Sequence, residues 1–260
     1  MSYETIDVAR DGPGCVVTLR RPERRNAVSL RMMDEILAAV RAAEADAAVS
    51  AVILTGGKEY FSAGADLTEA QQVRGAVDGG RYFKSWHRLT LGLEALEKPV
   101  IAAIEGFCLT GGCELALACD LRIAGAGASF AITSARIGTV AGAGGTQRLP
   151  RLVGPANALA MLFSAEPIDA AEAFRIGLVN RVVPAGEALE AAKVLARVYA
   201  ERAPIGLAFA KRAVHRGLQM SLEAGLDFET SLVTAIYGTE DKQEGISAFL
   251  EKRLPVFKGR

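Results

Sequence analysis

The sequence is poor in the residues that build metal, redox and disulfide sites. It contains two histidines, His87 and His215, and four cysteines, no two of which have C-x-x-C spacing. Zinc sites draw on closely spaced cysteine and histidine side chains, so we expect no metal site. The better interpretation of the cysteines is four reduced, mostly buried thiols.

An excess of either charge is also missing. Thirty Lys and Arg residues balance thirty Asp and Glu residues, which gives no global reason to expect nucleic acid or an anionic membrane surface as a partner. No apolar run approaches membrane-spanning length, and residues 1–7 carry neither the basic start nor the apolar run of a signal peptide. We therefore expect a cytoplasmic protein that acts on a small molecule, without nucleic acid or membrane partners.

Half of the residues are apolar, which is enough for one large domain or for one domain with an appendage. The N-terminal part predicts a β-branched strand at 15–19, a helix at 30–45 with Ser29 as its N-cap, and a strand at 51–55. This order is a βαβ opening, in which the two strands run parallel.

The next stretch continues the alternation. Residues 71–84 are polar and carry three glycines, which indicates a mobile or lid-like segment before a helix at 83–96. A buried strand is predicted at 99–104, a short helix at 111–119 and another strand at 121–124. Up to this point the chain has the pattern of an α/β protein.

The pattern changes in the C-terminal half. A flexible glycine run at 142–146 precedes a helix, and from residue 155 nearly every segment has helical periodicity interrupted by proline or glycine. We divide the chain into an α/β core, residues 1–200, and a helical C-terminal region, residues 201–260. Apolar faces in this region fit packing on the same chain and a subunit interface equally well.

Two short glycine-bearing segments, 61–67 and 110–114, each follow an apolar strand-like run, where α/β proteins place their chemistry. They predict two backbone N–H donors beside one carboxylate, Glu114. Such donors stabilise negative charge that develops on a carbonyl oxygen, while the carboxylate moves a proton or orients a water. The pattern is that of an enolate-forming site.

No G-x-G-x-x-G follows the first strand, which disfavours a dehydrogenase.

Six motifs in one order resemble the enoyl-CoA hydratase/isomerase (crotonase) family, and the resemblance runs nearly end to end. The motifs are R-P-E-R-R-N-A at 21–27, F-S-A-G-A-D-L at 61–67, K-P-V-I-A-A at 98–103, G-G-C-E-L-A at 111–116, G-A-G-G-T-Q-R-L at 142–149 and E-G-I-S-A-F-L-E-K-R at 244–253. One glycine string is a weak signal, but six in this order make chance an unsatisfactory explanation.

The resemblance implies an α/β crotonase-like spiral of ββα units that holds the coenzyme A site and the oxyanion hole. It also implies that the helical C-terminal region drives assembly of a homotrimer or a dimer of trimers. The implied substrate is an acyl-CoA thioester. No separate cofactor is expected, because coenzyme A is part of the substrate.

The resemblance assigns site residues where the letters match. The backbone N–H groups of Ala65 and Gly111 take the two oxyanion-hole positions, and Glu114 takes the position of the first of two catalytic glutamates. The positions that bind coenzyme A or substrate are Arg24, Ala27, Ala63, Ala65, Asp66, Leu67, Gly111, Thr133 and Ile137. Lys252 stands where it would reach a nucleotide phosphate or the adenine, and a plain surface lysine fits it equally well.

The family's second glutamate is missing, because Ser134 stands in its place. A hydroxyl has no ionisation accessible near neutral pH, so Ser134 would position a water or bind a substrate hydroxyl. The resemblance implies an enoyl-CoA hydratase, which adds water to a 2-enoyl thioester. One carboxylate would also allow enoyl-CoA isomerase, decarboxylase or racemase-like chemistry. A non-catalytic acyl-CoA-binding protein is the remaining hypothesis.

Overall fold

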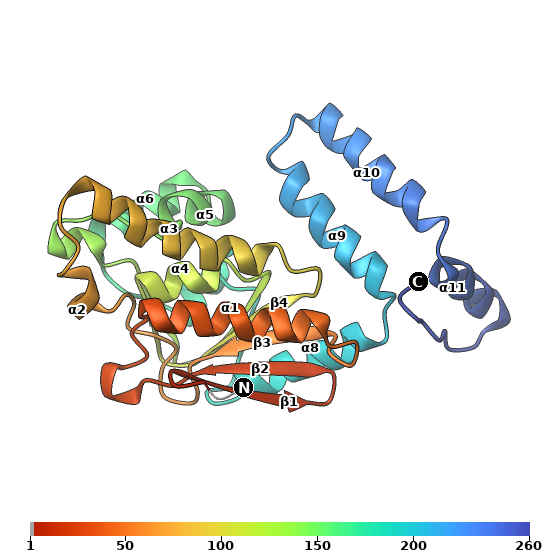
Figure 1. Ribbon diagram of the computed structural model, residues 1–260, viewed down its shortest axis with the longest axis horizontal. Coiled ribbons are helices and arrows are strands. Elements are labelled where there is room, and N and C mark those ends of the chain that lie inside the picture. Colours follow the sequence, from red (N-terminus) through yellow and green to blue (C-terminus); the bar gives the residue numbers. More distant parts are fainter. Residues whose placement is uncertain (1–2) are drawn as a thin grey trace.

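The computed structural model describes residues 3–260 as a mixed α/β protein with two sheets (Figure 1). The larger sheet has the strand order β1-β2-β3-β4-β6-β9, and the smaller has the order β5-β7-β8. The larger sheet is built from β1 (Ile6–Asp11), β2 (Gly14–Leu19), β3 (Ala51–Thr55), β4 (Val100–Ile104), β6 (Leu121–Gly125) and β9 (Arg181–Val183). The smaller contains β5 (Phe107–Leu109), β7 (Ser129–Ala131) and β8 (Ile168–Asp169).

α-Helices connect the strands of these sheets, cover the sheets and continue after the last strand. They are α1 (Leu30–Ala45), α2 (Leu67–Ala70), α3 (Gly75–Glu94), α4 (Gly111–Leu117), α5 (Gly145–Val153), α6 (Pro155–Ser164), α7 (Ala170–Arg175), α8 (Ala188–Ala200), α9 (Pro204–Gly217), α10 (Leu222–Ile236) and α11 (Glu240–Glu251). The predicted βαβ opening is confirmed: β2 and β3 pair in parallel around α1, and the Ser29 hydroxyl accepts the Met32 N–H at 3.1 Å.

The larger sheet is covered on both faces because successive side chains of a strand point to opposite sides. In β3, Val52 and Leu54 join the core that α1 and α3 cover, whereas Ile53 packs on the other side against Ala192 and Ala196 of α8. All five residues of β3 are buried, as the uninterrupted apolar run predicts for a central parallel strand.

A repeated winding brings the functional segments together. β4 lies in the larger sheet, β5 in the smaller sheet, and α4 follows; β6, β7 and α5 then repeat this course. An isolated bridge between Ser62 and Cys108 places the loop after β3 beside β5 in the same way. The loops and helix starts after the smaller-sheet segments therefore meet on one side of the core.

One expectation for secondary structure was wrong, and the expected helical C-terminal half is confirmed apart from two short strands. Residues 75–84 belong to α3 rather than to a mobile stretch, because burial of Tyr82 and Trp86 extends the helix through Gly79 and Gly80. The region after residue 155 also holds strands β8 and β9, whose two and three residues are too short to show periodicity.

The helical C-terminal region extends away from the sheets: α9 and α10 form an antiparallel pair, and α11 lies at the far end of the molecule (Figure 1). The expected division at residue 200 falls between α8 and α9. In the described part of the chain, no helix combines the length and apolar character needed to cross a membrane.

Candidate active site

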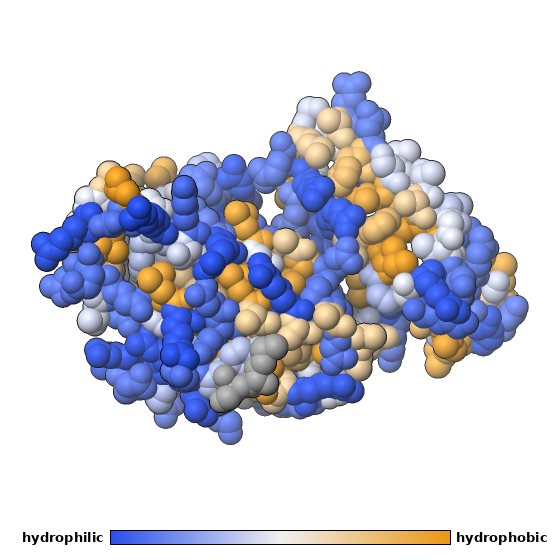
Figure 2. Space-filling view, viewed as in Figure 1, coloured by the Kyte–Doolittle hydropathy of each residue, from blue (hydrophilic) through white to orange (hydrophobic). Residues whose placement is uncertain are grey.

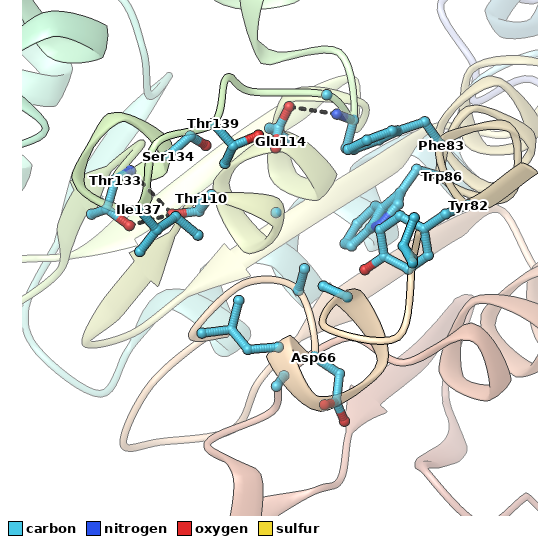
Figure 3. A pocket seen from close by; sticks show the side chains of 18 of the residues that line it. Asp66, Tyr82, Phe83, Trp86, Thr110, Glu114, Thr133, Ser134, Ile137 and Thr139 are labelled. Carbon is cyan, nitrogen blue, oxygen red and sulfur yellow. Dashed lines mark hydrogen bonds between the residues drawn. The ribbon is translucent and has the colours of Figure 1, made fainter. Parts of the chain in front are cut away.

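A cavity of about 830 Å³ opens between the 61–67 loop, α3, the start of α4 and the 3₁₀ turn Ser134–Ile137 (Figure 3). Its lining includes eleven of the residues expected at the site: Arg24, Ala27, Ala63, Ala65, Asp66, Leu67, Gly111, Glu114, Thr133, Ser134 and Ile137. Lys252 is absent from the lining and follows α11, away from the cavity in this chain.

The backbone N–H of Ala65 is directed away from its neighbouring strand. The Val28 N–H donates to the Gly64 carbonyl at 2.7 Å, and the Asp66 N–H donates to the Val28 carbonyl at 3.0 Å. In an extended segment successive amides point to opposite sides, so this pairing leaves the Ala65 N–H free for another acceptor.

Gly111 is the first residue of α4, so its backbone N–H lies at the start of the helix. The first N–H groups of a helix have no acceptor within the helix. Thr110 takes φ 45°, a costly conformation for a β-branched residue, and this turn directs the chain from β5 into α4. A Cβ on Gly111 would lie 3.0 Å from the Ala65 nitrogen, so the two amides are neighbours. Within residues 3–260 neither N–H donates to another group.

Glu114 lies on the first turn of α4 and is only 3% exposed. Its Oε1 accepts the N–H groups of Ala143 and Gly145, each at 2.8 Å. Burial raises the pKa of Glu114 to about 7, against the opposing effect of these two hydrogen bonds and of the Arg148 charge. Because Oε1 is occupied, Oε2 is the oxygen available for proton transfer in the cavity.

Hydroxyl groups line the cavity around Ser134, which stands in the place of the family's second glutamate. Figure 3 shows Ser134 and Thr139 on the same side of the cavity as Glu114. Ser134 is buried, and its hydroxyl has no hydrogen-bond partner among residues 3–260. The hydroxyls of Thr110 and Thr133 bond to each other at 2.7 Å. Thr139 was missed from the sequence, because a lone threonine in a loop carries no signal.

Three aromatic residues of α3 form the opposite wall of the cavity: Tyr82, Phe83 and Trp86 (Figure 3). Tyr82 and Phe83 meet edge to face with ring centroids 5.4 Å apart, and a Cβ on Gly111 would lie 2.8 Å from the Trp86 ring. The sequence analysis missed this wall, although the helical spacing of Tyr82 and Trp86 was a signal for a shared buried face.

Asp66 lines the cavity, but its carboxylate is bound by the protein. Oδ2 accepts from Arg21 at 2.8 Å, and Oδ1 accepts the Thr68 N–H at 2.9 Å at the start of α2. Burial alone would raise the pKa of Asp66, but these hydrogen bonds hold it below its usual value. The charge of Asp66 therefore fixes the loop that carries the Ala65 N–H.

In residues 3–260, no cluster of three or more His, Cys, Asp or Glu side chains is arranged to hold a metal ion.

Comparison with known proteins agrees with this geometry. The sequence model of the enoyl-CoA hydratase/isomerase family matches residues 13–260. A short-chain-enoyl-CoA hydratase from Clostridium acetobutylicum is 40% identical over the full length of both chains. A 2,3-dehydroadipyl-CoA hydratase from Escherichia coli is 42% identical, covering 97% of this chain and 98% of its own. The crystal structure of an enoyl-CoA hydratase from Bacillus anthracis superimposes with a TM-score of 0.93 at 37% identity, over 99% of this chain and all of its own. The predicted crotonase-like fold is thereby confirmed.

Proposed function

The chain belongs to the enoyl-CoA hydratase/isomerase family, and from this premise we propose that it adds water across the C2–C3 double bond of a 2-enoyl-CoA thioester. One observation carries the proposal: a buried carboxylate with a pKa near neutrality lines the same cavity as two backbone N–H groups that have no acceptor among residues 3–260. Curated relatives named as enoyl-CoA hydratases support the same reaction.

The two N–H groups stabilise the charge that the reaction creates. Attack at C3 moves an electron pair through C2 onto the thioester oxygen, so an enolate forms. Ala65 and Gly111 line the cavity, and their N–H groups, already held side by side by the fold, bind this oxygen without reorganisation. The positive end of the short helix α4 adds to the same potential.

Glu114 supplies the proton transfers. Its ionised Oε2 takes one proton from a water as the water oxygen bonds to C3, and the resulting carboxylic acid then gives a proton to C2. One water O–H bond breaks, one C–O and one C–H bond form, and the carboxylate is regenerated. The Ser134 hydroxyl accepts the second water hydrogen and so orients the attacking oxygen.

Double-bond migration is the second candidate, and Ser134 is the observation that favours it. Moving a double bond from C3 to C2 needs one group that removes a proton from C2 and returns it to C4. Glu114 can carry that proton, and the same two N–H groups stabilise the dienolate. No water has to be activated in this reaction, so the rate does not depend on a second carboxylate.

Steady-state assays with crotonyl-CoA and with a 3-enoyl-CoA separate these reactions. If the protein hydrates crotonyl-CoA and Glu114→Gln lowers kcat without a matching change in KM, the hydratase proposal stands. If only the 3-enoyl-CoA is converted, the isomerase replaces it. If Glu114→Gln changes neither rate, and acyl-CoA binds without turnover, the protein is a binding protein. Ser134→Glu is the matched variant that restores a second carboxylate.

We further propose that the protein is a cytoplasmic homotrimer or a dimer of trimers. Large apolar side chains exposed on and just after the C-terminal helix α11 support assembly, among them Phe249, Leu250 and Leu254. Lys252 lies in the same region, and we keep it as a candidate contact of the coenzyme A nucleotide.

A further inference from the structure

We propose that the ion pair between Glu94 and Arg148 is a positioning pair for Glu114, acting through the turn 143–145. This inference rests on the proposed function, because it concerns the carboxylate that moves the proton. It also gives a role to the 142–149 motif, most of which does not line the cavity.

The turn 143–145 is built around Arg148. Gly144 takes φ 113°, and its carbonyl accepts the Arg148 N–H at 2.7 Å as α5 begins. The Arg148 guanidinium returns to the same turn and donates to the Ala143 carbonyl at 3.2 Å. A Cβ on Gly144 would lie 1.9 Å from that guanidinium, so the side chain lies directly against the backbone of the turn.

The same turn holds the Glu114 carboxylate. Ala143 receives a hydrogen bond from Arg148 on its carbonyl and gives one to Glu114 Oε1 from its N–H. Gly145 gives the second N–H to the same oxygen. The Arg148 side chain therefore holds the short turn whose Ala143 and Gly145 N–H groups orient the Glu114 carboxylate.

Glu94 of α3 fixes Arg148 from the other side. The Arg148 Nε donates to Glu94 Oε1 at 2.5 Å, and the two side chains are only 18% and 24% exposed. α3 contacts this region twice more: His87 Nε2 lies 3.0 Å from the Gly142 carbonyl, and a Cβ on Gly142 would meet the Phe83 ring at 2.2 Å. The helix that supplies the aromatic wall thus also holds the turn.

The pair acts on the proton affinity of Glu114 as well as on its position. The Arg148 charge lowers the pKa of Glu114, which opposes the effect of burial. Glu94 offsets part of that positive charge. The titratable groups that line the same cavity include Arg24, Asp66 and Tyr82. His87 of α3 faces the Gly142 carbonyl, Cys113 precedes Glu114 on α4, and Arg136 on the 3₁₀ turn pairs with Glu166.

The two halves of the pair give opposite predictions. Glu94→Gln leaves the Arg148 charge uncompensated, so the pKa of Glu114 falls. Arg148→Gln removes the favourable charge and one support of the turn, so the pKa rises. We expect shifts of about half a unit to one unit in each direction. Arg148→Lys keeps the positive charge. In this variant the pKa of Glu114 should therefore stay nearer to the wild-type value than it does in Arg148→Gln.

The experiment measures the pKa in two ways. The pH dependence of kcat/KM reports it through catalysis, and infrared difference spectra against Glu114→Gln report the carboxylate directly in the free protein. Arg88→Gln, which breaks an ion pair of α3 with Asp34 away from the turn, is the control and should shift nothing.

Shifts in opposite directions support the proposal. A rise in both variants would support the positioning role through the turn and would overturn the effect of the pair's charge on Glu114. No shift in either variant would overturn the inference as a whole. If the protein has no hydratase activity, the infrared titration still decides the role of the pair, so failure of the proposed function is seen separately.

Discussion

At the scale of single residues, the environment of Glu114 determines when it is active. Catalysis by Glu114 as a base requires the ionised form, so we expect kcat/KM to rise as the pH passes through about 7 and to level off above it. Glu114→Gln should lower kcat by about 10²- to 10⁴-fold at the plateau. A rate that stays constant from pH 5 to pH 9, or an active Gln variant, would exclude Glu114 as the base.

The same burial makes Glu114 costly for stability. Its pKa is raised from 4.5 to about 7 in the folded protein, so the folded state binds a proton more tightly than the unfolded state. The free energy of unfolding therefore decreases as the pH rises from 4.5 to 7, by about 3 kcal/mol at 1.4 kcal/mol per pKa unit. Thermal melts should show Glu114→Gln gaining stability over the wild type between pH 5 and pH 8. A constant difference would contradict the raised pKa.

Gly111 has no room for a side chain beside the Ala65 amide. A Cβ there would approach Trp86 at 2.8 Å and the Ala65 nitrogen at 3.0 Å, so Gly111→Ala should displace the two N–H donors. We expect kcat to fall by about 10²- to 10³-fold, as on loss of one oxyanion donor. Gly80→Ala in α3 is the control, because a Cβ there would meet no atom of residues 3–260 within 4 Å and alanine favours the helix. Equal activity of both variants would refute this geometry.

Sequence motifs placed the polar groups of the site but not its walls. Ala65, Gly111 and Glu114 lie in glycine-bearing motifs whose backbone requirements are local. The helical spacing of Tyr82 and Trp86 indicates a buried face, but which segments that face meets depends on long-range packing, and Thr139 in its loop has no local signal at all.

At the scale of elements, α1 was predictable because its cap and its apolar spacing are both local. The start of α3 was not, because Gly79 and Gly80 are local signals against a helix that tertiary burial overrides. β9 was missed because three residues become a strand through pairing with β6, far away in the sequence.

The docking of α9 on the core depends on Lys211. Its ammonium group pairs with Asp120 at 2.8 Å and donates to the carbonyls of Leu93 and Lys98, with a side chain only 8% exposed. Lys211→Met should destabilise the protein by about 2 kcal/mol or more, because it leaves these groups without their partner. Hydrogen exchange should increase first in α9 and α10.

The adjacent residue is the control for this prediction. Arg212 pairs with Glu97, and the two side chains are 35% and 59% exposed. Arg212→Met should cost less than about 1 kcal/mol, as for solvent-exposed ion pairs. Equal denaturant midpoints for the two variants would show that α9 is held by apolar packing rather than by Lys211.

At the scale of the whole molecule, the C-terminal helices leave more apolar surface exposed than one chain needs. Hydrophobic side chains gather over α9 and α10 in Figure 2. Leu218, Leu222, Phe249, Leu250 and Leu254 are each more than 70% exposed. A soluble single chain seldom leaves so many large apolar groups in water, which is why these faces fit a subunit interface.

Charged substitutions test this interface. Phe249→Asp with Leu250→Asp should dissociate the assembly, because a carboxylate buried at an interface without a partner costs several kcal/mol. Light scattering on the wild type should give three or six times the mass of one chain, and the double variant should give less. Val77→Asp is the control, since Val77 is exposed and apolar but lies on α3. A monomeric wild type, or a double variant with unchanged mass, would show that these faces do not form the interface. The activity of the dissociated form then tells whether the cavity works within one chain, or whether a group from a neighbouring subunit completes it.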